Sequence, residues 1–423
     1  MEGGDLVPSI PARHAAAAPR RRFGRIAGTP AFAVVASVIG LALAASATPS
    51  PLYGVYQADW GFSTVTLTLV YAVYAIGVLG ALLIAGSISD QVGRRPTLVA
   101  ALSGLIVSTV LFSVADSVAW LYVARALQGL STGVALGAAG AAMIDLHPRA
   151  DAKRIGLVNG TVSSAGLGVG ALVSSMLVEY VPAPQVVPFV VLGVIFAITL
   201  LATLALPEPV ARRGGSHLKV RIQRPSVPTA IRGAFLLSAL GILASWSVGG
   251  IYLSLGPQLA AEMLNTHSHL AGGIAIASLT LPATLTQLRF NHLDPHRAAA
   301  GGSVVLAIGM ALIVVSLSTG SGAFFIAASV LTGTGWGVAF LGALRSLTSV
   351  IPPAKRAQVM SAFYVVAYSA LAFPAIIAGI VVTHAGLDST FRVFGLIVMA
   401  LALVVAVLAE RMRIAQTRMV SRR

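Results

Sequence analysis

The sequence predicts an all-α integral membrane protein with twelve transmembrane helices, arranged as two six-helix bundles. Of its 423 residues, 57% are hydrophobic and only 10% are charged, whereas a soluble chain carries about 25% charged residues. The apolar residues form runs of about 20, the length that a helix needs to cross a bilayer. Lysine and arginine gather in every second connection between these runs. Length, composition and charge therefore agree on a membrane protein.

Twelve apolar runs follow one another along the chain, and each is long enough for one crossing. They cover residues 30–49, 64–88, 96–114, 119–144, 155–178, 186–206, 233–256, 270–288, 301–318, 322–346, 358–383 and 390–409. The first 28 residues are polar, basic and rich in alanine, a composition that predicts a disordered tail. Residues 411–423 form a second, basic tail.

Basic residues indicate which way the helices run. The two tails and the connections after even-numbered runs hold all 28 lysines and arginines except Arg125 and Arg392. Cytoplasmic connections of membrane proteins carry such an excess. We therefore expect both termini in the cytoplasm, and we attribute the net charge of +15 to this topology and not to nucleic-acid binding.

A long connection, residues 207–232, divides the chain near its middle. It contains six basic residues, two adjacent glycines and four prolines, as expected of a flexible linker. The run Gln128–Leu136 before it resembles Thr332–Phe340 after it, at an offset of 204 residues. Such a repeat predicts two parallel halves. We expect one bundle over residues 29–206 and a second over residues 233–410.

A short charged joint, Gly86–Arg95, separates the second run from the third. Asp90 falls where a helix ends, and the partly negative end of that helix disfavours its carboxylate. Asp90 therefore needs a positive partner. Gly86 is expected to allow close helix packing, and Gly93 is expected to make a tight turn.

Two motifs resemble signatures of the major facilitator superfamily. The segment Gly86–Arg95 reads Gly-x-x-x-Asp-x-x-Gly-Arg-Arg and is similar to that family's signature between helices 2 and 3. Arg125–Gly133 reads Arg-x-x-Gln-Gly-x-x-x-Gly and is similar to its helix-4 signature. The resemblance covers about residues 30 to 410. Thr48–Tyr53 and Trp60–Ser63 resemble bacterial members of drug-efflux or sugar-efflux type.

The resemblance implies a bacterial secondary transporter of the inner membrane that works by alternating access. Its substrate site would lie near mid-membrane between the halves. It also implies that Asp90, with Gly86, Gly93, Arg94 and Arg95, closes the cytoplasmic side by meeting the N-terminal end of helix 11. That end is near residue 356.

Arg125 is the one ionisable residue that falls well inside a predicted span. A charge there costs at least about 2.5–3.5 kcal/mol, so Arg125 must face a cavity or a partner. The resemblance implies proton coupling or substrate contact. The alternative is a structural role, in which Arg125 binds carbonyls and ties helices together. Asp145 is the second coupling candidate, although Arg149 or Arg154 is an alternative partner for it.

Proton coupling is weakened by two departures from the family pattern. None of the thirteen acidic residues falls in the middle of a span, and proton-driven transporters generally need such a group. The segment Gly166–Ser175 carries Ala171 and two serines where drug/proton antiporters carry a proline and a glycine pair. Coupling would then use acids at helix ends, or the protein is a facilitator.

Aromatic and amide side chains are the remaining candidates for contact with a substrate, although each is also a plausible packing residue. They are Tyr71, Tyr74, Gln128, Asn159, Trp246, Tyr252, Trp336, Tyr364 and Tyr368. Such a lining suits a lipophilic, neutral or weakly charged compound, and Arg125 would also tolerate an anion.

Other chemistries find little support in the chain. The absence of cysteine excludes disulfides and thiol catalysis. His292 and His296 flank an Asp-Pro turn, and His267 and His269 fall in a predicted external loop. No phosphate-binding loop for ATP is present. We expect no cofactor, no enzymatic activity and a monomer among membrane lipids. Export is favoured by the resemblance, with an uptake facilitator or symporter and a non-transporting receptor as alternatives.

Overall fold

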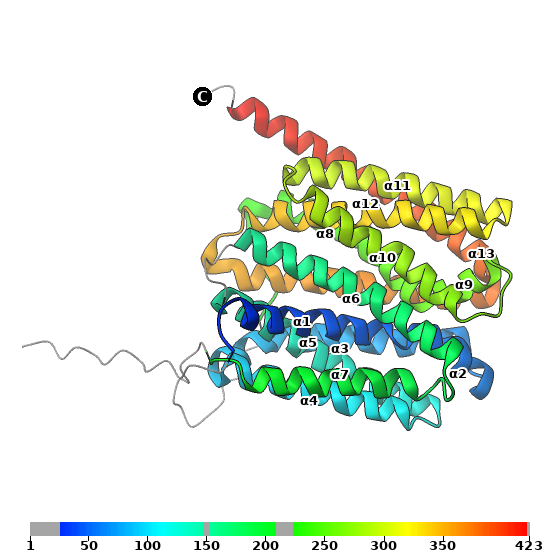
Figure 1. Ribbon diagram of the computed structural model, residues 1–423. Coiled ribbons are helices and arrows are strands. Elements are labelled where there is room, and N and C mark those ends of the chain that lie inside the picture. Colours follow the sequence, from blue (N-terminus) through cyan, green and yellow to red (C-terminus); the bar gives the residue numbers. More distant parts are fainter. Residues whose placement is uncertain (1–25, 147–151, 209–222, 421–423) are drawn as a thin grey trace, which may run out of the picture.

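The computed structural model describes residues 26–146, 152–208 and 223–420, and helices account for most of them. Eleven helices in these ranges are long and apolar enough to cross a membrane. A helix satisfies every backbone N–H and C=O within itself, which a bilayer demands because it offers no water. Figure 1 shows the helices side by side in two groups, one above the other.

The N-terminal half contains six long helices and two short ones. They are α1 (Thr29–Ala47), η1 (Ser50–Leu52), α2 (Tyr53–Trp60), α3 (Thr64–Val92), α4 (Arg94–Ser113), α5 (Val118–Leu146), α6 (Ala152–Tyr180) and α7 (Val187–Leu204). The six predicted spans of this half are confirmed to within a few residues at each end.

The C-terminal half has the same plan. Its elements are η2 (Thr229–Ile231), α8 (Arg232–Ser254), α9 (Gly256–Met263), α10 (Leu270–Phe290), α11 (Pro295–Thr319), α12 (Gly322–Thr348), η3 (Pro353–Lys355) and α13 (Arg356–Val420). The 65-residue α13 is interrupted at Gly386, whose φ of 79° and ψ of 169° are not helical. It therefore counts as two crossings, and the prediction of twelve spans is confirmed. The exact borders of the two halves stay a prediction.

One helix begins earlier than expected. α11 begins at Pro295 and not near residue 301, because Asp294 accepts hydrogen bonds from the backbone N–H groups of His296 and Arg297. An aspartate in this position satisfies donors that a helix start leaves unpaired, and proline fits the first turn. His292 thus lies outside the helix and His296 inside it, so the two do not form a helical ligand pair.

The two halves meet mainly through α6 with α10 and α3 with α13. Along the first pair, three glycines each leave room for a partner from the other half: Gly160 for Gln287, Gly168 for Thr280, and Gly273 for Ser175. A side chain on any of these glycines would collide with its partner. Small residues allow helices to approach closely in membranes, so this contact is tight along its length.

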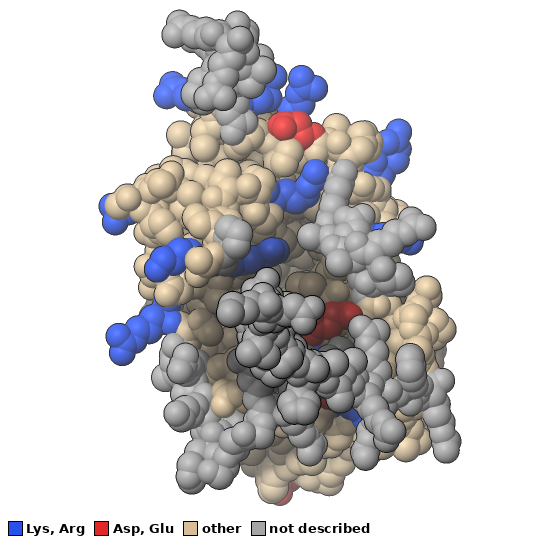
Figure 2. Space-filling view, turned by 90° about the vertical axis from the view of Figure 1, so that its left-hand side faces the viewer, with Lys and Arg blue, Asp and Glu red and all other residues tan. Residues whose placement is uncertain are grey.

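The ends of the bundle differ in composition. We call the end that carries residues 92–95, 205–208, 223–232 and 345–358 the basic end. Figure 2 looks onto this face and shows lysine and arginine side chains spread over the C-terminal half. The other end, with η1, α2, α9 and the connection between α9 and α10, is called the opposite end. The candidate sites lie at both ends and between the halves.

Candidate functional site

At the basic end, Arg94 connects two helices. Its guanidinium lies 2.6 Å from a carboxylate oxygen of Asp90 and 2.9 Å from one of Asp145, and it donates to the hydroxyl of Ser89 at 3.0 Å. The side chain of Arg94 is only 12% exposed, whereas that of Asp90 is 65% exposed. Arg94 thereby links the end of α3 to the end of α5. Asp145 thus pairs with Arg94; of the two alternative partners considered for it, Arg149 lies outside the described residues.

Glu208, just after α7, adds a third segment to the contact of α3 with α5 around Arg94. Its carboxylate accepts hydrogen bonds from the backbone N–H groups of Arg94 and Arg95, both at 3.0 Å. A carboxylate is favoured there because a helix start is partly positive. Gly93 has a φ of 112°, and a side-chain carbon on it would lie 2.7 Å from Glu208. The predicted turn at Gly93 is confirmed, and its positive φ is the reason that glycine is favoured there.

Sequence reasoning missed Glu208, although one signal was present: an acid between two prolines, directly after an apolar run. The expectation for Gly86 is wrong. A side-chain carbon on Gly86 would meet nothing within 4 Å, so the position does not serve close packing in this structure.

Asp90 was expected to contact the start of α13, but the structure pairs it with Arg94, and a different segment bonds to α13. Residues 223–228, which we call the strap, run between the halves. The backbone N–H of Gln223 donates to the carbonyl of Leu83 on α3 at 2.9 Å, and that of Ser226 donates to the carbonyl of Gln358 on α13 at 3.3 Å. Asp90 pairs with Arg94, one helical turn away, because that cation is closer in the chain. The strap therefore connects α3 with α13 at the basic end.

Arg125 on α5 is fully buried. Its Nε and Nη2 atoms donate to the hydroxyl of Tyr53 at 2.8 and 2.5 Å. Its Nη1 atom donates to the carbonyl of Ser46 at 2.9 Å and to the side-chain oxygen of Gln128 at 2.7 Å. Gln128 in turn donates to the carbonyl of Ala45 at 3.0 Å. We call these groups the Arg125 network.

Aromatic rings surround the same guanidinium. Its carbon lies 5.4 Å from the ring centres of Tyr53 and Tyr74 and 5.8 Å from that of Phe112. Rings at this distance stabilise a cation through their negative faces. The Arg125 network joins α5 to α1 and α2, which are contacts that a structural role predicts. A role in coupling or substrate contact stays a prediction, and the partner Tyr53 was missed although it lies in the segment Thr48–Tyr53.

Five of the nominated aromatic residues meet where the halves join. They are Tyr71 and Tyr74 of α3, Trp246 of α8, and Tyr364 and Tyr368 of α13. We call them the interface aromatic cluster. Trp246 and Tyr368 pack edge to face with ring centres 5.1 Å apart. The hydroxyl of Tyr71 is buried without a partner in the described structure, so it is an unsatisfied polar group inside this cluster.

The other nominated residues lie elsewhere. The hydroxyl of Tyr252 lies 2.7 Å from that of Ser329 on α12, and the indole of Trp336 donates to the carbonyl of Ser245 at 2.7 Å. Both residues belong to the core of the C-terminal half. Asn159 is half-buried on α6. Their proposed contact with a substrate is untested.

Sequence reasoning also missed Gln287 of α10, which packs against Gly160 of α6. It is 1% exposed, and its amide nitrogen donates to the hydroxyl of Ser164 on α6 at 3.0 Å. Its side-chain oxygen has no partner in the described structure. Gln287 is therefore a buried polar group between the halves. A lone glutamine in an apolar run was the available signal.

At the opposite end, side chains bridge the halves. The amide nitrogen of Gln258 on α9 donates to the amide oxygen of Gln57 on α2 at 2.5 Å. The backbone N–H of His269 donates to the carboxylate of Glu179 on α6 at 2.8 Å. These bonds hold the opposite end together in this conformation. Within the described ranges, no group of three or more His, Asp or Glu residues is placed to hold a metal.

The fold and these junctions define a polytopic helical membrane protein with two halves around a common interface. The family model described as Major Facilitator Superfamily matches residues 35–374, and the chain belongs to this family. It is a multi-pass membrane protein of a transporter family, whose members handle small molecules.

Several relatives are bacterial proteins named for drug resistance. The chain is 35% identical over 104 residues to Multidrug resistance protein MdtL of Escherichia coli, which is 24% of this chain and 27% of the relative. It is 34% identical over 127 residues to Puromycin resistance protein pur8 of Streptomyces alboniger, 29% of this chain and 25% of the relative. With MdtL of Citrobacter koseri it shares 27% identity over 239 residues, 54% and 60% of the two chains. The matches thus span less than two thirds of these relatives.

A solved structure agrees on the fold. The crystal structure of a POT family transporter in complex with 5-aminolevulinic acid superposes with a TM-score of 0.72. It shares 14% sequence identity, and the match covers 90% of this chain and 96% of the other. At this identity the comparison concerns the fold alone.

Proposed function

We propose that this chain is a secondary transporter that exports a small lipophilic or weakly charged organic compound by alternating access. The family supports the mechanism, in which a site between two halves opens to one side of the membrane at a time. The resistance names of the bacterial relatives support export and a bacterial inner membrane.

The position of the Arg125 network beside the interface aromatic cluster carries this proposal. Tyr74 connects the two: its ring lies 5.4 Å from the guanidinium of Arg125, and it packs with Tyr71 and Tyr368 between the halves. A buried cation next to aromatic rings suits a compound that has a ring and a hydrogen-bond acceptor or weak negative charge. A ligand here would contact both halves, as alternating access requires.

We assign the basic end to the cytoplasm, because cytoplasmic connections carry the excess of lysine and arginine. The bonds of Gln57 with Gln258 and of Glu179 with His269 would then close the external side. The strap would lie at the cytoplasmic entrance. An exported compound would reach the interface aromatic cluster past the strap and leave past the glutamine pair.

Coupling to protons is assigned in this proposal to Arg125 and Asp145. Asp145 bonds Arg94 at 2.9 Å, and a proton on that carboxylate would remove one charge of the pair. Because Arg94 links α3 with α5, this would loosen the cytoplasmic junction. Asp90, the other partner of Arg94, is given a gating role on the same grounds.

The test is a susceptibility panel in bacteria that lack their own exporters, with and without this chain. Neutral, anionic and cationic lipophilic compounds are compared, with and without an uncoupler. We expect at least fourfold higher tolerance to some neutral or weakly acidic compounds, lost on uncoupling. Arg125→Lys should abolish it at equal expression, and Arg392→Lys, an exposed arginine paired with Asp388, should not. Unchanged tolerance across the panel, or full activity of Arg125→Lys, would contradict the proposal.

Asp90→Asn tests the gating role separately. It removes the charge of the 2.6 Å pair with Arg94 while keeping the shape of the side chain. We expect transport to be abolished with expression retained. Normal transport by Asp90→Asn would assign the cytoplasmic closure to the strap alone.

A further inference from the structure

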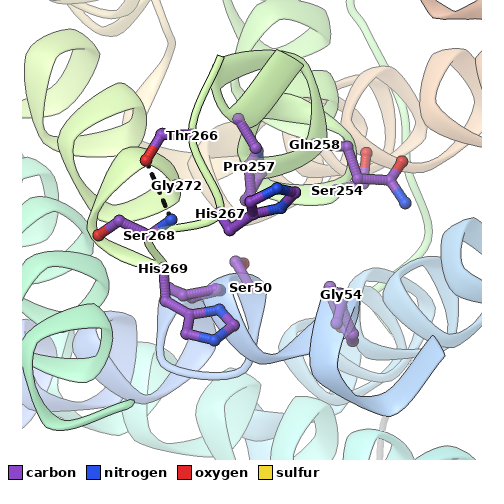
Figure 3. Close-up of a pocket in the computed structure, with 13 residues that line it drawn as sticks. Ser50, Gly54, Ser254, Pro257, Gln258, Thr266, His267, Ser268, His269 and Gly272 are labelled. Atoms are coloured by element: carbon purple, nitrogen blue, oxygen red, sulfur yellow. Dashed lines mark hydrogen bonds between the residues drawn. The ribbon is translucent and has the colours of Figure 1, made fainter. Parts of the chain in front are cut away.

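A cavity of about 210 Å³ opens at the end of the bundle opposite the basic end. Its lining comes from both halves: residues 50–54 of η1 and α2 on one side, and residues 254–272 of α8, α9, the following connection and α10 on the other. We call this cavity the vestibule. In Figure 3, His267 and His269 reach into it from the connection, with Ser50 and Gly54 facing them.

The vestibule is lined by uncharged groups. None of its thirteen lining residues is Asp, Glu, Lys or Arg. Two charges lie behind this lining and are already bonded. Arg125 donates to the hydroxyl of Tyr53, and Glu179 accepts the backbone N–H of His269. The lining itself therefore supplies no carboxylate, ammonium or guanidinium group as a counter-charge to an ion.

Several polar groups of the vestibule can donate hydrogen bonds to a ligand. Ser50 is fully buried, and its hydroxyl has no partner in the described structure. The hydroxyl oxygens of Thr266 and Ser268 accept backbone N–H groups at 3.1 and 3.3 Å, which leaves their own hydrogens free to donate. The imidazoles of His267 and His269 each add an N–H.

Apolar surfaces complete the lining. Pro51, Pro257, Ala261 and the ring of Tyr53 contribute to it. Drug-sized ligands occupy about 300–1,000 Å³, so a cavity of about 210 Å³ takes a single ring or one end of a larger molecule. Donor groups in an apolar, uncharged cavity recognise oxygen acceptors on a neutral molecule, because an ion would lose its hydration without a counter-charge.

We propose that the vestibule is a binding site for an uncharged ring compound that carries carbonyl or hydroxyl oxygens. The site is distinct from the interface aromatic cluster. The ligand would contact η1 and α2 of one half and the connection between α9 and α10 of the other. Its binding is a property of the purified chain and needs no transport, so it can be tested whether or not the chain exports.

The test uses three one-ring probes that differ in charge: benzamide, benzoate and benzylammonium. Binding to the purified full chain in detergent is measured by saturation-transfer NMR, with empty micelles as background. We expect benzamide to bind at least fivefold more tightly than either ion. Equal or tighter binding of benzoate or benzylammonium that is weakened by Gly54→Leu, and so takes place in the vestibule, would overturn the proposal.

Two variants locate the binding. Gly54→Leu adds a side chain at the rim, where a side-chain carbon meets nothing within 4 Å, and should weaken benzamide binding at least tenfold. Ser50→Ala removes one donor, and the loss of one hydrogen bond should weaken binding roughly twofold to tenfold. Ser37→Ala, on α1 with its hydroxyl bonded to the carbonyl of Val34, is the matched control. Gel filtration verifies the fold, and unchanged affinity in Gly54→Leu would refute the site.

Discussion

Tyr53→Phe tests how the buried charge of Arg125 is held. The substitution keeps the ring that lies 5.4 Å from the guanidinium and removes only the hydroxyl, which accepts two N–H groups of Arg125. A hydrogen bond to a charged group contributes about 1.5–3 kcal/mol, and donors left unpaired in the interior add to the loss. We therefore expect a cost of about 3 kcal/mol, roughly a hundredfold change in an equilibrium constant.

Tyr56→Phe is the matched control. Tyr56 is one turn further along α2 and equally buried, but its hydroxyl has no partner in the described structure. Its removal should leave stability unchanged or slightly higher. The midpoint of thermal unfolding in detergent is measured at one heating rate, because unfolding of such proteins is often irreversible. Transport is measured in parallel. Equal midpoints and equal transport for the two variants would refute the argument.

Three further outcomes are expected. Gln223→Pro and Ser226→Pro each remove one backbone N–H of the strap, and each lost hydrogen bond is worth about 0.5–1.5 kcal/mol. Both variants should speed the labelling of a cysteine introduced at the basic end of this cysteine-free chain. Gln223→Ala keeps its N–H and should not change the labelling rate. Glu208→Ala removes the carboxylate at the start of α4, which should cost about 0.5–2 kcal/mol of stability and lower the midpoint of thermal unfolding. An unchanged midpoint would show that Glu208 does not stabilise the start of α4. Burial and the neighbouring carboxylate of Asp388 raise the pKa of Glu262, so the folded state holds that proton more tightly than the unfolded state. Stability from this group is present at low pH and lost as pH rises through the raised pKa, and Glu262→Gln should raise the midpoint at pH 7 but not at pH 4.

The twelve spans could be predicted because apolar runs are a local property of the chain. Their ends were less certain where a single residue decides them. Asp294 starts α11 by accepting two backbone N–H groups, and Gly386 divides α13 through its backbone conformation alone. The apolar runs 358–383 and 390–409 did leave a break around Gly386. They did not place the start of α11, because Asp294 acts through backbone hydrogen bonds and not through hydropathy.

The candidate site could be predicted only in part. Arg125 and Gln128 were found because a charge or an amide inside a span is conspicuous, but Tyr53 lies 72 residues from Arg125 in the sequence, and no local pattern reveals that pair. The placement of Trp336 within one half could not be foreseen either. Helices in the middle of a bundle are apolar on all sides, so their sequence does not indicate which face meets the other half.

Asp90 shows why a motif does not fix a contact. A carboxylate at the end of α3 needs a positive partner. The sequence offers two: the partly positive start of α13 and the guanidinium of Arg94. The structure pairs Asp90 with Arg94 at 2.6 Å, in the same stretch of chain, so the interaction needs no approach of the two halves. At the basic end, backbone groups of the strap bond to both α3 and α13.

The polar bonds that join the halves therefore differ between the two ends of the molecule. At the opposite end, the glutamine pair is a neutral bond and the contact of Glu179 with His269 involves one charge. Typical values for such bonds give about 2–4.5 kcal/mol together. Reversing a two-state equilibrium from 1:99 to 99:1 needs about 5.5 kcal/mol of differential binding. A compound that binds the externally open state a few hundredfold more tightly supplies about 3.5 kcal/mol, which is comparable to these bonds. Binding energy of this size would offset these two bonds and shift the equilibrium toward the externally open state, although not by the full 5.5 kcal/mol.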